Sequence, residues 1–151
     1  MRRNNVTIVL AEDDDGHATL IEKNLIRSGL QNTLIRVKDG LEALELIRGE
    51  GAHLNKPIPE RILLILDINM PRMDGLEALR QIKQDSSLAM IPVIILTTTD
   101  DPREIEKCYR EGCNLYVSKP VAYDAFVEVI RRLGLFLEVV HLPGGAVKTP
   151  E

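Results

Sequence analysis

The sequence contains very few aromatic residues: tryptophan is absent, and Phe, Trp and Tyr together make up 3% of the 151 residues. A hydrophobic core must therefore be built mainly from Leu, Ile and Val. Long apolar runs are missing as well, since the longest covers residues 62–66, far short of the ~18 residues that span a bilayer. The first residues contain no apolar stretch of the kind found in signal peptides. We therefore expect a cytoplasmic protein that does not enter a membrane.

Cysteine is scarce too, and there is no excess of positive charge. The two cysteines, Cys108 and Cys113, are too few for the disulfide framework of a small secreted domain, and their spacing matches no common zinc site. We expect both to be small buried residues. The formal net charge of −4 gives no basic excess of the kind that nucleic-acid binders usually show. Nucleic acid is therefore not an expected partner.

The sequence does contain short apolar segments that alternate with segments of helical periodicity. Apolar runs without polar alternation are typical of strands buried on both faces of a parallel sheet. The pattern predicts an α/β fold, a doubly wound five-stranded parallel sheet with helices on both faces. The segment 62–66 is the most apolar and should be central, whereas 33–37 alternates and suits a sheet edge. The expected strands are 6–11, 33–37, 62–66, 92–96 and 115–118, and the expected helices are 16–28, 39–49, one after Gly75, 102–111 and 123–140, with a loop at 51–60.

Polar residues follow or end four of the predicted strands: Glu12 and Asp13 the first, Asp67 the third, Thr97 the fourth and Lys119 the fifth. In open parallel sheets, ligands bind beyond the carboxyl ends of the strands, so these side chains should meet at one edge. Clustered carboxylates repel one another, and a hard divalent cation relieves that repulsion.

This edge therefore predicts a Mg²⁺ site that serves phosphoryl transfer. We expect Asp13 and Asp67 to bind the metal directly, Glu12 to bind it through water, and the backbone carbonyl of Asn69 to supply a further oxygen. Asp67 is then a candidate carboxylate nucleophile. The Lys119 ammonium and the Thr97 hydroxyl would contact the oxygens of the transferred group.

As a set, these residues resemble the receiver domain of two-component response regulators. The resemblance extends from Val6 to about Val140 and rests on Glu12-Asp13, Asp67 with Pro71 and Gly75, Thr97, and Lys119-Pro120. It implies a sheet of order 2-1-3-4-5 in a receiver domain at 1–141. The proline and glycine residues after that point favour a flexible tail at 142–151. Two departures are Glu12, where an aspartate is common, and Thr98, where a small residue is common.

The resemblance also implies a function: a response regulator in a two-component phosphorelay. Asp67 would accept a phosphoryl group from a sensor histidine kinase or a phosphotransfer protein, and the chain would catalyse only its own phosphorylation and dephosphorylation. Thr97 and Tyr116 would be the switch residues that change conformation, and the alternative for Tyr116 is a strand aromatic that packs at the sheet edge. An unknown downstream protein would receive the signal. The stretch from Cys108 to Tyr116 and the long last helix look most like regulators paired with phytochrome-type kinases.

The last predicted helix has more apolar residues than a single core-facing stripe requires. Leu135, Val139 and Leu142 form a second stripe on roughly the opposite side. Exposed apolar patches usually mark interfaces, so we expect a homodimer through this helix. His17 follows the acidic residues and could approach the predicted site, but a position on the helix surface is favoured.

Two other functions fit part of the pattern. A haloacid-dehalogenase-like phosphohydrolase also uses an aspartate at a strand end but needs a second one two residues later, where this sequence has Asn69. A binding module that works without phosphorylation would not need to concentrate so much charge at one edge. A transcription factor is disfavoured because residues after 140 offer no DNA-binding domain.

Overall fold

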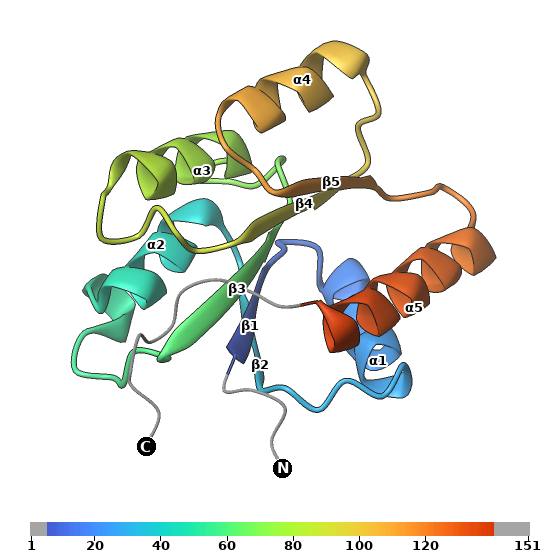
Figure 1. The fold of residues 1–151 in the computed structure, drawn as a ribbon, viewed down its shortest axis with the longest axis horizontal. Coiled ribbons are helices and arrows are strands. Elements are labelled where there is room, and N and C mark those ends of the chain that lie inside the picture. Colours follow the sequence, from blue (N-terminus) through green and yellow to red (C-terminus); the bar gives the residue numbers. More distant parts are fainter. Residues whose placement is uncertain (1–5, 141–151) are drawn as a thin grey trace.

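A computed structural model describes residues 6–140 of the chain. In this range five parallel strands form one sheet of order β2-β1-β3-β4-β5, with helices on both faces (Figure 1). The predicted α/β architecture and strand order are confirmed, with β3 at the centre and β2 at an edge. The predicted tail at 142–151 lies outside the described residues.

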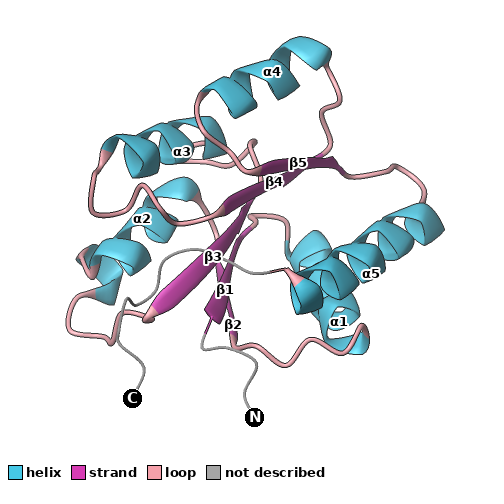
Figure 2. Ribbon diagram, in the orientation of Figure 1, coloured by secondary structure: helices cyan, strands magenta, loops and turns pink. Residues whose placement is uncertain are grey.

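Strands and helices alternate along the chain (Figure 2). Their ends differ from the predicted ones by at most one residue, and capping residues decide where α1 and α2 begin. The Asp14 carboxylate accepts a hydrogen bond from the His17 backbone N–H, so α1 begins at Asp15. The elements are β1 (Val6–Ala11), α1 (Asp15–Arg27), β2 (Leu34–Val37), α2 (Gly40–Arg48), the 3₁₀ helix η1 (Gly51–His53) inside the predicted loop, β3 (Arg61–Leu66), α3 (Gly75–Gln84), β4 (Val93–Thr97), α4 (Pro102–Arg110), β5 (Leu115–Ser118) and α5 (Tyr123–Val139).

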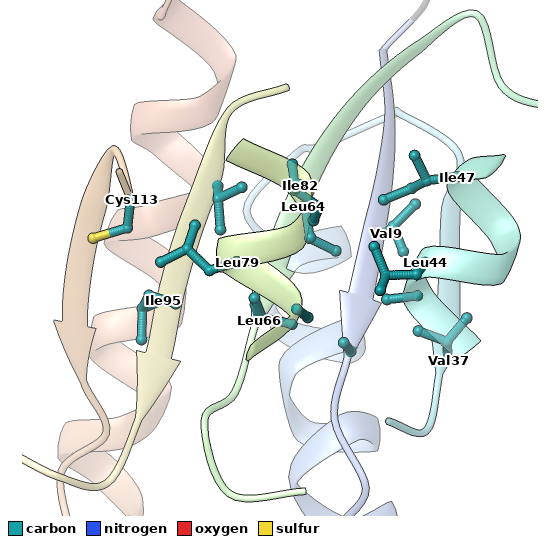
Figure 3. Packing of buried hydrophobic residues seen from close by; sticks show 14 of the residues in the cluster. Val9, Val37, Leu44, Ile47, Leu64, Leu66, Leu79, Ile82, Ile95 and Cys113 are labelled. Carbon is teal, nitrogen blue, oxygen red and sulfur yellow. The ribbon is translucent and has the colours of Figure 1, made fainter. Parts of the chain in front are cut away.

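Two hydrophobic layers lie on opposite faces of the sheet. Helices α2 and α3, with Cys108 of α4, cover one face, and their side chains pack on Val9, Leu64 and Ile95 (Figure 3). Helices α1 and α5 cover the other face. Both cysteines are buried in the first layer as unpaired thiols, as expected, and burial raises the pKa of Cys108 to about 12.

The strand register aligns the carboxyl ends of the central strands. Ala11 of β1 pairs with Leu66 of β3, and Leu66 in turn pairs with Ile95 of β4. Residues that follow these positions therefore meet at one edge of the sheet. Within residues 6–140, no helix combines the length and the apolar character needed to cross a membrane.

Candidate functional site

Three carboxylates meet where β1 and β3 end. Glu12, Asp13 and Asp67 each offer an oxygen that lies within 4.8 Å of the others. The Asp67 N–H donates to the Ala11 carbonyl (3.1 Å), which extends the β1–β3 ladder to the site. Glu12 and Asp67 are 1% and 8% exposed, whereas Asp13 is exposed. The predicted acidic cluster is therefore present, with two acids inside and one at its mouth.

Lys119 joins this cluster from the end of β5. Its buried Nζ donates to Glu12 Oε1 at 2.6 Å and to Asp67 Oδ2 at 3.0 Å. Its backbone N–H donates to the Thr97 carbonyl (2.6 Å), which fixes the start of its side chain beside β4. The predicted meeting with this lysine is thus observed for Glu12 and Asp67.

The local charges are unbalanced, because three carboxylates face one ammonium. Burial, together with the negative charge of Asp67, raises the pKa of Glu12 to about 7, although the hydrogen bond from Lys119 opposes this. An all-oxygen set with surplus negative charge suits a hard divalent cation such as Mg²⁺ or Mn²⁺. The residues present therefore fit a metal. Asn69 is exposed two residues after Asp67, and its carbonyl remains a predicted ligand.

Thr97 is the last residue of β4 and is fully buried. Its Oγ1 has no hydrogen-bond partner among residues 6–140. Buried hydroxyls in folded proteins are nearly always hydrogen-bonded, so an orphan at this position needs a reason. A donor held beside the acidic cluster is suited to a ligand oxygen.

Arg36 of β2 holds the acidic segment and was not predicted from the sequence. Its Nε and Nη2 donate to the Glu12 carbonyl at 2.8 and 2.6 Å, and its Nη1 lies 2.9 Å from Asp15 Oδ1. The backbone of Glu12 is therefore clamped from the neighbouring strand. The clue in the sequence was one arginine in an otherwise apolar strand, opposite a run of acids.

Gly75 allows α3 to begin directly against Asp67. A Cβ at this position would lie 2.0 Å from the Asp67 carbonyl oxygen, and the Gly75 N–H donates to the Ile68 carbonyl at 2.8 Å. Any side chain would push the helix away. The Ile68 N–H also donates to Asp67 Oδ1 (2.7 Å), so the Asp67 carboxylate is held on both oxygens.

His17 departs from the prediction that it lies on the helix surface. It is half-buried, and its Nδ1 lies 3.0 Å from Lys119 Nζ. The reason is its place on α1, four and seven residues before Ile21 and Asn24, which are both buried. Extending that stripe back by one turn would have revealed it.

Tyr116 is half-buried on β5, and its hydroxyl donates to the Thr99 carbonyl at 2.8 Å. Burial raises the pKa of this phenol above its ordinary value. The side chain therefore contacts the segment that follows β4, close in sequence to Thr97. Its role as a switch residue remains a prediction.

The surface of α5 is apolar near its end. Leu135 and Val139 are 43% and 69% exposed, as predicted, and Phe136 beside them is also exposed. Leu142, the third member of the predicted stripe, lies outside the described residues. The interface role of this surface remains a prediction.

Comparison with known proteins places these features in a family. The model of the response regulator receiver domain matches residues 8–131. Response regulator Rcp1 of Synechocystis sp. is 34% identical over 137 residues, covering 90% of this chain and 92% of that protein. Its Mn²⁺-bound form is similar in structure, with a TM-score of 0.83 at 32% identity, covering 91% of this chain and 99% of that one.

Two further solved structures are similar. A response regulator receiver domain from Rhodospirillum rubrum is 43% identical, with a TM-score of 0.82 and coverage of 92% of this chain and 98% of that one. The phosphorylated cyanobacterial phytochrome response regulator RcpA is 32% identical, with a TM-score of 0.82 and coverage of 91% and 98%. The family match, the fold and the strand-end residues agree, and the chain belongs to the response regulator receiver family, whose members act in two-component phosphorelays.

Proposed function

We propose that Asp67 is the phosphoryl acceptor of this response regulator. The observation that carries the proposal is the convergence of Asp67, Glu12 and Lys119 beside a buried Thr97 hydroxyl that has no partner among the described residues. Glu12 and Asp67 are each held by a backbone N–H and by the lysine, and of these two we assign the acceptor role to Asp67. It lies on the central strand's end, between the ends of β1 and β4.

The chemistry is a displacement at phosphorus. An oxygen of Asp67 attacks the phosphorus of a phosphohistidine, the P–N bond breaks, and the imidazole keeps the electron pair and takes up a proton. The Lys119 ammonium pairs with one phosphoryl oxygen, and the Thr97 hydroxyl donates to another. Hydrolysis of the acyl phosphate by water reverses the modification, so the chain catalyses only its own phosphorylation and dephosphorylation.

A divalent cation, Mg²⁺ under cellular conditions, would be held by Glu12, Asp13, Asp67 and the Asn69 carbonyl. When bound, it would neutralise negative charge on the phosphoryl oxygens. The Mn²⁺-bound form of the relative Rcp1 supports a metal requirement of this kind. Among the protein's own side chains, Lys119 supplies the positive charge that faces Glu12 and Asp67.

Thr97 and Tyr116 are proposed to carry the signal. The Thr97 hydroxyl gains a partner only when a phosphoryl oxygen is present, so phosphorylation favours a packing in which it is satisfied. Tyr116 bonds the Thr99 carbonyl, so a shift of residues 97–99 changes the position of that ring. The surface of α4 and β5 would then differ between the two states.

Acetyl phosphate with Mg²⁺, followed by intact mass measurement, tests the acceptor. We expect the mass of one phosphoryl group to be added to the wild type and to be absent from Asp67→Asn. The matched control is Asp74→Asn, which alters an exposed helix-cap aspartate outside the cluster and should label normally. Undiminished labelling of Asp67→Asn would place the acceptor elsewhere.

The phosphoryl donor is proposed to be a sensor histidine kinase of the phytochrome type, or a phosphotransfer protein, in the cytoplasm, where ATP supplies the phosphoryl group. The resemblance to RcpA and Rcp1 supports a phytochrome-type kinase over others. Transfer from the purified kinase domain should label Asp67 faster than acetyl phosphate does.

A homodimer through α5 is proposed from its exposed apolar side chains, Leu135 and Val139. The sequence pattern adds Leu142 to this proposed interface. Sedimentation with and without acetyl phosphate tests it. We expect dimers in the wild type and a shift toward monomer in a Leu135→Glu, Val139→Glu double variant. Monomer alone in every condition would contradict the proposal.

A further inference from the structure

Lys119 makes three contacts through one ammonium group. Two of its acceptors are the carboxylates of Glu12 and Asp67, and the third is His17 Nδ1 at 3.0 Å. An ammonium has three N–H donors, so these acceptors use all of them. With its side chain 1% exposed, Lys119 has almost no water to replace a lost partner. His17 therefore completes the coordination of the buried lysine.

The direction of this hydrogen bond fixes the state of the imidazole. An ammonium can only donate, so Nδ1 must accept, and the ring proton must lie on Nε2. His17 is thus a neutral acceptor beside two negative ones. A neutral acceptor binds the ammonium more weakly than a carboxylate or phosphate oxygen does. Of the three bonds, the one to His17 is the easiest to exchange for a phosphoryl oxygen.

The ring is held in place by two helices. The His17 backbone N–H in the first turn of α1 donates to Asp14 Oδ1 at 2.9 Å. The imidazole packs against Phe126 of α5 with ring centroids 5.4 Å apart and planes at 82°, an edge-to-face contact. The acceptor presented to Lys119 is therefore fixed from the side of the sheet that α1 and α5 cover.

We propose that His17 is a positioning residue that holds Lys119 at the acceptor site until a phosphoryl oxygen takes its place. This inference rests on the proposed function of Asp67. Two carboxylates accept only two of the three N–H groups, so without His17 the third N–H has no acceptor and the flexible lysine side chain is held less firmly. With His17 present, that N–H points away from the carboxylates and becomes available to the incoming group by one exchange of partner.

Two substitutions separate the acceptor from the packing of the ring. His17→Phe keeps an aromatic ring against Phe126 but has no acceptor, and His17→Asn restores an acceptor near the position of Nδ1. We expect His17→Phe to lower the initial rate of labelling by acetyl phosphate and Mg²⁺ by about tenfold, the equivalent of one charged hydrogen bond. His17→Asn should stay within about threefold of the wild type. The affinity for Mg²⁺ alone should be unchanged in both.

The outcomes distinguish this inference from the function on which it rests. If the wild type takes up no phosphoryl group, the acceptor proposal itself is wrong. If the wild type is labelled and His17→Phe is labelled as fast, His17 does not position Lys119. A slow His17→Phe with an equally slow His17→Asn would assign the effect to ring packing and overturn the acceptor role.

A measurement on the wild type covers the case in which a variant fails to fold. Nitrogen NMR of the labelled imidazole reports which ring nitrogen carries the proton. We expect the Nε2–H tautomer with an unprotonated, hydrogen-bonded Nδ1 in the unphosphorylated chain, and a changed Nδ1 resonance after labelling with acetyl phosphate. A proton on Nδ1 in the unphosphorylated chain would rule out the bond to Lys119 and with it the proposal.

Discussion

Buried residues in the body of the sheet differ in kind from those at its carboxyl edge. Along β3, residues 62–66 are apolar and almost fully buried, and the next residue is Asp67. At the edge, four of the buried residues are polar or charged: Glu12, Asp67, Thr97 and Lys119. The change from apolar to charged takes place between two successive residues, Leu66 at the end of β3 and Asp67 after it.

Burial stabilises the fold in the body of the sheet and costs stability at its carboxyl edge. Apolar burial in the body is favourable and needs no partner. At the edge, burial brings like charges together, as the raised pKa of Glu12 shows, and leaves the Thr97 hydroxyl without a partner among the described residues. Substitutions in the two regions should therefore change stability in opposite directions.

The largest effect is expected in the body. Leu64→Ala removes a fully buried side chain from the centre of the sheet and should lower the free energy of unfolding by about 2–5 kcal/mol, measured by urea denaturation. The control is Leu54→Ala, the same change at a residue 61% exposed, which should cost less than about 0.5 kcal/mol. Equal losses for both would mean that burial does not separate them.

At the edge we expect a smaller effect of opposite sign. Thr97→Val replaces the unpartnered hydroxyl by a methyl group and should raise the free energy of unfolding of the unphosphorylated chain by about 1 kcal/mol. Thr98→Val, at an exposed neighbour, should be neutral. A clear loss of stability in Thr97→Val would show that the hydroxyl is satisfied in solution, for example by water.

The smallest effect concerns a buried acid outside the edge cluster. Burial would raise the pKa of Asp39, but hydrogen bonds from Arg72 (2.8 Å) and from the Glu42 N–H outweigh burial, and the pKa is lowered from 3.8. A lowered pKa stabilises the fold above the unfolded-state pKa, and this contribution is lost as the pH falls through the folded-state pKa.

Asp39→Asn keeps a helix-capping side chain and removes the charge. At pH 7 it should lower the free energy of unfolding by less than about 1 kcal/mol, because the Arg72 side chain is half exposed and water screens the pair. Stability measured from pH 7 down to pH 2 should show this difference shrink below about pH 4. A difference that is constant with pH would exclude the ion pair as its source.

Most of the fold followed from the sequence because a parallel sheet buried on both faces needs continuous apolar strands. Residues 62–66 show this, as does the position of Asp67 immediately after them. Polar residues at strand ends could be brought together by reasoning alone, since parallel strands end at one edge. Glu12, Asp67 and Lys119 were found in this way, and the structure joins them.

What the sequence did not reveal depends on side chains that reach between elements. Arg36 contacts the Glu12 carbonyl from the neighbouring strand, and His17 contacts Lys119 across 102 positions of sequence. The pattern of each segment can mark the residue as unusual, but it does not identify the partner on the other element. The sequence also did not reveal the main partner of Glu12. Glu12 was expected to bind a metal through water, and in the structure its carboxylate pairs directly with Lys119.

The close fit of Gly75 against Asp67 has a consequence for the direction of any structural response. The main chain at Asp67 has no free volume on the α3 side, because even a methyl group on Gly75 would overlap its carbonyl. If Asp67 accepts a phosphoryl group as proposed, the backbone cannot recoil toward α3. We therefore expect the added volume to displace residues on the other sides of Asp67, among them the end of the neighbouring strand β4, while α3 stays in place.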